Sequence, residues 1–90
     1  MELLLIDARD NVAVALAPIA AGAELRAGGV TIRSLSTIPF GHKVALRDIP
    51  SGGAVVKYGE VIGKARVFIP SGSHVHVHNL ESLRGRGDLV

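Results

Sequence analysis

The sequence contains no cysteine, which excludes a disulfide framework, a thiolate metal site and a thiol nucleophile. Tryptophan is also absent, and the aromatic residues are limited to Phe40, Phe68 and Tyr58. The hydrophobic fraction of 48% therefore consists almost entirely of Val, Ile, Leu and Ala. Such a core is aliphatic and rich in β-branched residues, which favours strands. At 90 residues the chain is long enough for one core, so we expect a single domain.

Strong charge and long apolar runs are missing too. The formal net charge is only +2, and the basic residues are scattered without interleaved aromatics, which argues against a nucleic-acid partner. The apolar run of residues 3–6 lies between Glu2 and Asp7 and is far too short for a signal peptide or a membrane span. We therefore expect a cytoplasmic protein that makes no membrane contact.

Short apolar segments alternate with turn signals along the whole chain. Residues 2–6 and 12–16 have strand length, and the second segment places alanines on one face and larger side chains on the other, which predicts close packing on both sides. Gly28 and Gly29 precede residues 30–33 and are typical of a tight hairpin turn. Proline and glycine then recur about every ten residues without a helical repeat. The pattern predicts a compact all-β sandwich or barrel-like fold with little helix.

The C-terminal residues differ in composition from the rest of the chain. Residues 84–88 read Arg-Gly-Arg-Gly-Asp, which is polar and rich in glycine. We therefore expect the domain to span residues 1–82 and residues 83–90 to form a flexible tail.

The segment 73–79 is the most informative one for function. It reads Ser-His-Val-His-Val-His-Asn, and an extended strand would place His74, His76 and His78 on one face. Neighbouring imidazoles would then lie about 6.6 Å apart, from where two can converge on one divalent ion at about 2.0 to 2.1 Å. All three imidazoles could bind one ion only if the strand were strongly bent. The alternatives to metal binding are a solvated polar face and a hydrogen-bonded histidine cluster, and the pattern leaves these three interpretations open.

Two further places carry side chains suited to catalysis. His42 and Lys43 follow Gly41 at the start of an apolar strand. There Lys43 can hold a substrate carboxylate, and its charge favours neutral His42, the form that acts as a ligand or base. Tyr58 precedes Gly59 at a turn, where its phenol can donate to a substrate oxygen or simply pack over the edge of the core. The alternative for His42 and Lys43 is that both are simply exposed polar side chains at the start of a strand.

Three segments together resemble the small N-terminal domain of the altronate and galactarate dehydratase family: DNVAVAL at 10–16, GHKVALRDIPSGGAVVKYGEVIGKA at 41–65, and GSHVHVHN at 72–79. The resemblance covers nearly the whole chain, and the ordered combination is specific although each piece alone is weak. It implies a β-clip fold of the SAF type. The terminal histidines favour the altronate branch, or the related small subunit of sulfolactate sulfo-lyase, over the galactarate branch.

The resemblance also implies a chemistry and a partner. It indicates a hydro-lyase that removes water from a sugar acid such as altronate, with Fe(II) or Mn(II) as the divalent metal and a large catalytic subunit as the partner. Position by position, the family's GHK, KYG and HVHxHN motifs fall on residues 41–43, 57–59 and 74–79. Our hypothesis is that the metal ligands come from His74, His76 and His78, with His76 and His78 favoured, and that His42, Lys43 and Tyr58 are catalytic. The same hypothesis gives contact with the sugar-acid substrate to Lys43 and Asn79.

The reaction needs a base beside the carboxylate and an electrophile for the leaving hydroxyl. Because Asp10 and Glu60 are among few carboxylates at suitable positions, we expect much of the site to come from the partner. A non-catalytic sugar-acid-binding or assembly module is the rival interpretation, and self-association into a homo-oligomer is left open.

Overall fold

The structure is a computed structural model that describes residues 2–83. Short strands joined by tight turns make up this part of the chain, which contains no helix and hence none that could cross a membrane. The strands are β1 (Leu3–Leu4), β2 (Val12–Ala15), β3 (Glu24–Ala27), β4 (Val30–Arg33), β5 (Lys43–Ala45), β6 (Ala54–Lys57), β7 (Glu60–Ala65), β8 (His74–Val75) and β9 (Leu80–Ser82). The all-β prediction is confirmed. The predicted tail lies outside the described residues except for Leu83.

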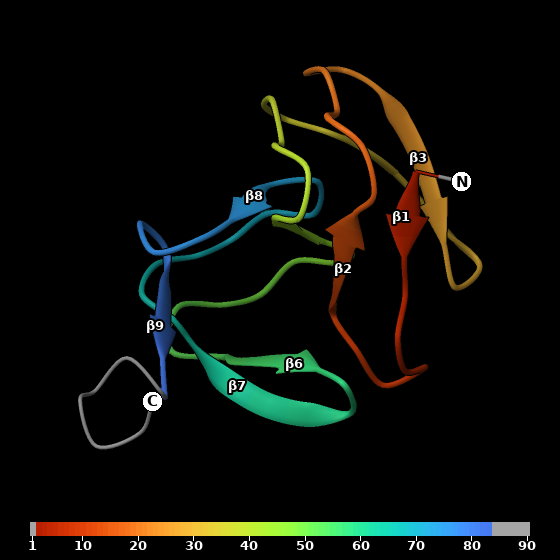
Figure 1. Ribbon diagram of the computed structural model, residues 1–90. Coiled ribbons are helices and arrows are strands. Elements are labelled where there is room, and N and C mark those ends of the chain that lie inside the picture. The colour runs from red at the N-terminus through yellow and green to blue at the C-terminus, as the bar shows by residue number, and fades with distance from the viewer. Residues whose placement is uncertain (1, 84–90) are drawn as a thin grey trace.

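The strands form three antiparallel sheets (Figure 1). A central sheet has the order β1-β2-β5-β8, the hairpin β3-β4 lies beside β1, and the sheet β6-β7-β9 lies on the opposite side of the molecule. The predicted hairpin at Gly28 and Gly29 is confirmed, because both residues have positive φ and link β3 to β4. Glycine reaches this backbone region without the steric cost that a Cβ brings.

The central sheet carries a separate core on each of its two faces. Successive residues of β2 and β5 point to opposite faces, so Val12 and Ala45 join one core while Ala13 and Val44 join the other. The predicted packing of this segment on both sides is thereby confirmed. The first core contains Leu3, Ala13, Ala15, Ile19, Leu25, Ile32, Ile38, Val44 and Leu46. The second contains Val12, Ala45, Ile49, Val55, Ala65, Ile69, Val75 and Leu80.

Four turns of the chain share one local design. Each begins with a buried isoleucine, and three residues later comes a glycine with φ between 81° and 88°. The turn then closes with a hydrogen bond from the residue after the glycine to the carbonyl of the residue after the isoleucine. The isoleucines are Ile19, Ile38, Ile49 and Ile69, and they pair as two isolated bridges, one in each core. Positive φ at the third turn position is the mark of a type II turn.

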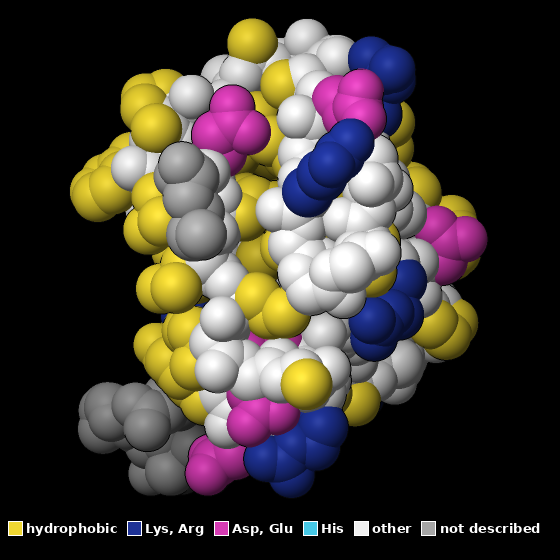
Figure 2. Space-filling view, turned by 90° about the vertical axis from the view of Figure 1, so that its right-hand side faces the viewer, with side chains coloured by type: hydrophobic (Ala, Val, Ile, Leu, Met, Phe, Trp, Pro, Cys, Tyr) yellow, Lys and Arg dark blue, Asp and Glu magenta, His cyan; other side chains and the backbone are white. Residues whose placement is uncertain are grey.

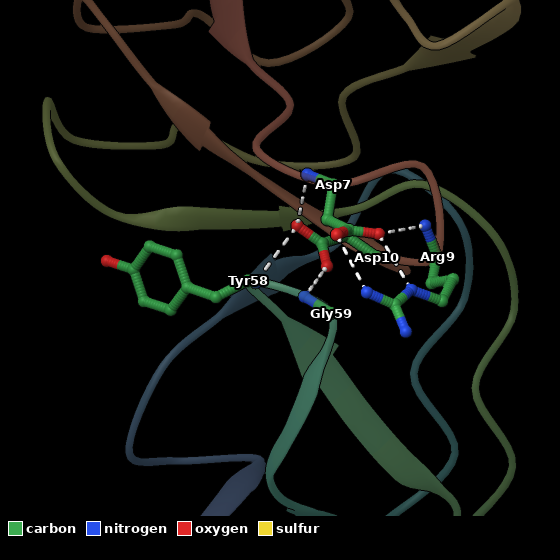
Figure 3. A network of polar contacts seen from close by, with 5 residues as sticks. All are labelled: Asp7, Arg9, Asp10, Tyr58 and Gly59. Atoms are coloured by element: carbon green, nitrogen blue, oxygen red, sulfur yellow. Dashed lines mark hydrogen bonds and ion pairs between the residues drawn. The ribbon is translucent and has the colours of Figure 1, made fainter.

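A buried carboxylate ties the β6–β7 hairpin to the loop before β2 (Figure 3). Asp10 is 1% exposed and accepts hydrogen bonds from the backbone N–H groups of Tyr58 at 3.1 Å, Gly59 at 2.8 Å and Asp7 at 3.1 Å. Tyr58 has φ of 61°, which is uncommon for a residue with a Cβ. The Asp10 carboxylate therefore stabilises a turn that Tyr58 alone would disfavour.

Replacing Asp10 with Asn should lower the free energy of unfolding by about 2 to 3 kcal/mol, because an amide nitrogen would then face backbone N–H donors in a buried place. Urea unfolding followed by circular dichroism measures this. Asp48→Asn is the matched control, since Asp48 is exposed and accepts one backbone hydrogen bond, from Ser71 at 2.9 Å. If both variants lower the free energy of unfolding equally, the buried Asp10 network contributes no more stability than a single exposed hydrogen bond.

Candidate metal centre

His42 occupies the last position of the turn that leads into β5. Its N–H donates to the carbonyl of Pro39 at 3.1 Å, and its own carbonyl accepts from the N–H of Ala15 at 2.9 Å. The backbone of His42 is therefore held on both sides before its side chain makes any contact. The imidazole is half-buried.

Strand pairing brings His42 to the C-terminal histidines. Strands β5 and β8 are antiparallel, with Val44 opposite His74 and Lys43 opposite Val75. Extending this register by one residue sets His42 opposite His76. Directly opposed residues of an antiparallel pair have Cβ atoms about 4.5 to 5.5 Å apart, so their rings can meet.

The predicted histidine strand is wrong beyond Val75, where β8 ends and a turn over residues 76–79 begins. The amide side chain of Asn79 holds this turn: its Oδ1 accepts from the N–H of His76 at 3.0 Å, and its Nδ2 donates to the carbonyl of His74 at 2.9 Å. Val77 is 73% exposed instead of packing on a core. The turn bends the chain after Val75, but it brings only His74 and His76 of the three predicted histidines into one group of nitrogens.

Three imidazoles converge as a result. The Nδ1 of His42 lies 2.8 Å from the Nε2 of His74, and one ligand nitrogen from each of His42, His74 and His76 lies within 4.8 Å of the other two. The ring centroids of His42 and His76 are 4.2 Å apart, and the rings are stacked. We refer to these three residues as the histidine triad. The ring of His78 lies 5.3 Å from that of His74, but His78 is not part of the triad.

The surroundings of His74 and His76 favour their neutral forms. Partial burial lowers the pKa of His74 below its ordinary value of 6.5, and the nearby His42, His78, His76 and Lys43 lower it further. The pKa of His76 is lowered by the same two causes, burial first and then positive neighbours. A neutral imidazole has the free lone pair that a metal needs, so these lower pKa values favour the ligand form of His74 and His76.

An open cavity of about 510 Å³ adjoins the triad at His76. Its lining includes Lys43, Lys57, Tyr58 and Glu60, so two predicted catalytic residues, Lys43 and Tyr58, share one cavity with a triad histidine. The Tyr58 side chain is 57% exposed and points away from the Asp10 network (Figure 3). The triad and this cavity are the only part of the described chain where predicted site residues gather. On the face drawn in Figure 2 charged and apolar side chains are mixed and no histidine is visible.

The structure redistributes the predicted roles. His42 joins the imidazoles whose nitrogens are close enough to share an ion, whereas His78 lies beside them. Asn79 is 7% exposed and its amide is engaged with the backbone, so it shapes the turn and the predicted substrate contact does not fit. Asp10, weighed as a site carboxylate, is a buried structural group. Sequence reasoning missed Lys57 in the cavity, although its position directly before Tyr58 at a turn is the signal that could have found it.

Comparison with known proteins gives the family of this chain. Residues 1–83 match the family model described as the altronate/galactarate dehydratase SAF domain. The chain is 47% identical over 79 residues to altronate dehydratase of Escherichia coli (strain K12), covering 88% of this chain and 16% of that protein. It is 44% identical over 77 residues to altronate dehydratase of Bacillus subtilis (strain 168), with 86% and 16% covered.

A third relative is a separate subunit. The alpha subunit of (2R)-sulfolactate sulfo-lyase from Chromohalobacter salexigens is 47% identical over 47 residues, which cover 52% of this chain and 50% of that subunit. The chain thus spans about a sixth of the length of the two altronate dehydratases and matches half of the sulfo-lyase subunit. The family match extends over nearly all of the described residues, and on this evidence the chain belongs to the altronate/galactarate dehydratase SAF domain family.

Proposed function

We propose that this chain is the metal-binding small part of a hydro-lyase that converts a sugar acid of the altronate type to a 2-keto-3-deoxy acid, together with a larger catalytic chain. The observation that carries the proposal is the histidine triad, in which three side chains from two distant segments bring their nitrogens within 4.8 Å of one another. A hydrogen bond between imidazoles joins only two rings, so it does not account for the third ring of the triad.

The triad fits a divalent ion. Cis ligands of a six-coordinate ion at about 2.1 Å lie about 3 Å from each other, close to the 2.8 Å between the ring nitrogens of His42 and His74. Imidazole suits Fe(II), whereas Mn(II) prefers carboxylate, carbonyl and water oxygens, so the ligand set favours Fe(II) over Mn(II). Three protein ligands leave coordination positions for the substrate and for groups of the partner chain.

The remaining residues of the cavity serve the substrate. The bound ion would supply charge stabilisation to the carboxylate and to the departing hydroxyl. Lys43, half-buried at the cavity wall, binds the carboxylate of the acid as a fixed positive charge. The phenol of Tyr58 reaches the same cavity, where it donates a hydrogen bond to a substrate oxygen or moves a proton.

A larger partner supplies what this chain lacks. The region that matches is 16% of the length of the altronate dehydratases, so most of the enzyme lies outside it in those relatives. Around the cavity, Val61, Val77 and Leu83 are 52%, 73% and 43% exposed, and gathered exposed apolar side chains are typical of a surface that another chain covers. Residence in the cytoplasm stays a prediction.

A sulfolactate sulfo-lyase is the second candidate. Its support is the similarity to a sulfo-lyase alpha subunit, in which the matched region lies in a separate chain and covers almost the same share of both proteins. The two candidates differ in the leaving group, a hydroxyl in one case and a sulfonate-derived sulfite in the other. Product analysis therefore separates them.

The triad should bind one divalent ion per chain. His42→Ala, His74→Ala and His76→Ala should each weaken Fe(II) binding at least about tenfold, because each removes one ligand. Anaerobic titration calorimetry with Fe(II), repeated with Mn(II), measures the affinities.

His78→Ala is the matched control, since His78 lies next to the triad without joining it. Its affinity should stay within about twofold of the wild type. A loss in His78→Ala as large as in the triad variants, or no stoichiometric binding by the wild type, would contradict the proposed centre.

The Asn79 side chain should affect metal affinity only by positioning His76, because it is not itself a ligand. Asn79→Ala should weaken Fe(II) binding by about threefold or more, because His76 is no longer held beside His42. Asn11→Ala is the control, since the Asn11 side chain also bridges two backbone groups, those of Ala54 at 2.9 Å and Val56 at 2.8 Å, away from the histidines. If both variants lower metal affinity equally, general destabilisation explains the effect.

Activity should appear only when the chain is combined with a large dehydratase chain and a divalent ion. Mixed with candidate partners and sugar acids, the wild type should yield a 2-keto product, and the His42→Ala variant should lower its rate of formation at least about tenfold. Full activity of a mixture that contains the His42→Ala variant would show that the chain is a non-catalytic binding or assembly module. Release of sulfite from sulfolactate would favour the second candidate.

A further inference from the structure

Two lysines face the cavity that adjoins the histidine triad. Lys43 comes from the start of β5, and Lys57 comes from the end of β6, so the cavity lies between the central sheet and the sheet β6-β7-β9. Both side chains are half-buried where they line this one cavity, so their ammonium groups share its wall. Like charges that share a partly desolvated wall repel each other, and an anion placed between them relieves that cost.

The described residues offer these lysines no counter-ion. The ion pair found in this part of the chain joins Arg9 to Asp7 at 3.0 Å, and neither Lys43 nor Lys57 lies within 4.0 Å of a carboxylate oxygen of a described residue. Glu60 lines the same cavity without pairing with either lysine. Two positive groups and one negative group leave one positive charge on the wall, which matches one carboxylate.

Lys57 is held in place for such a contact. Its Nζ lies 4.7 Å from the centroid of the Tyr58 ring, a distance at which an ammonium is attracted to the face of the ring. Tyr58 in turn lies on the turn that Asp10 fixes through the N–H groups of Tyr58 and Gly59. The contact with the ring and the fixed backbone at Tyr58 restrict Lys57 before an anion binds, which lowers the entropic cost of binding.

We infer that Lys57 joins Lys43 in a two-lysine subsite that grips the single carboxylate of a hydroxy acid and leaves the rest of the molecule pointing toward His76. This deepens the proposed function and rests on it for the identity of the natural acid, but the subsite itself needs no metal. Lys57 thereby becomes a substrate-binding residue beside Lys43.

Gluconate is a suitable probe, since it is a sugar acid with one carboxylate, and sorbitol is the same polyol without the charge. Metal-free, ¹⁵N-labelled chain should show saturable shifts of the backbone amides of Lys43, Lys57 and His76 when gluconate is added at constant ionic strength. Sorbitol should not shift them. Lys57→Gln and Lys43→Gln should each weaken gluconate binding about threefold to tenfold, as expected for the loss of one charge-assisted contact.

Lys64→Gln is the matched control, because Lys64 belongs to β7 of the same hairpin, is exposed and does not line this cavity. It removes the same charge and should leave the gluconate affinity unchanged. The subsite is overturned if Lys57→Gln binds like the wild type, if Lys64→Gln weakens binding equally, or if sorbitol produces the same shifts. The gluconate experiment uses no metal, so its outcome is independent of the Fe(II) titration of the triad. Failure of one experiment does not overturn the claim that the other tests.

Discussion

The central sheet is the constraint on which the rest of the molecule depends, because it is covered on both faces. Val12 and Ala45 pack into one core while Ala13 and Val44, their direct neighbours in sequence, pack into the other. A slip of one residue in the pairing of β2 with β5 would exchange the two faces, which pins the register strongly. Small and β-branched side chains suit β2 and the residues of β5 paired with it, since both of their faces are packed there. Both hydrophobic cores and the histidine triad inherit their geometry from this pairing.

Main-chain hydrogen bonds bring the segments of the histidine triad together. The N–H of Ala45 donates to the carbonyl of Ser73, and the N–H of Gly72 donates to the carbonyl of Ala45, both within 2.9 Å. These bonds hold the edge strand against β5 and so carry His74 to His42 across 32 residues of sequence. The turn at 76–79 then folds His76 back over His42. Rigid pairing on one side and a side-chain-held turn on the other leave the imidazoles little freedom, which favours metal binding by reducing the ordering cost.

Local patterns in the sequence predicted much of the fold but only part of the site. The paired glycines at 28 and 29 specify a hairpin by their own conformational preference, and the alanine and valine alternation of residues 12–15 reports burial on both faces. The alternation of histidine and valine after Ser73 predicts a strand. It does not reveal the turn after Val75, because that turn depends on hydrogen bonds between the Asn79 amide and the backbone of His74 and His76. The entry of His42 into the triad depends on long-range register, which no local signal encodes. Resemblance to the family supplied the β-clip topology that periodicity could not.

The four turns with a shared design imply that the scaffold is modular. The residue that follows the turn glycine is Ala23, His42, Gly53 or Ser73, so one position of four equivalent ones bears a group able to coordinate an ion, and the others bear small residues. An imidazole therefore stands on a single copy of a backbone turn that occurs four times in the described residues. The architecture tolerates variety at this corner because the closing hydrogen bond uses main-chain atoms alone. Diversification within such a scaffold can therefore proceed by decorating another copy without redesigning the frame.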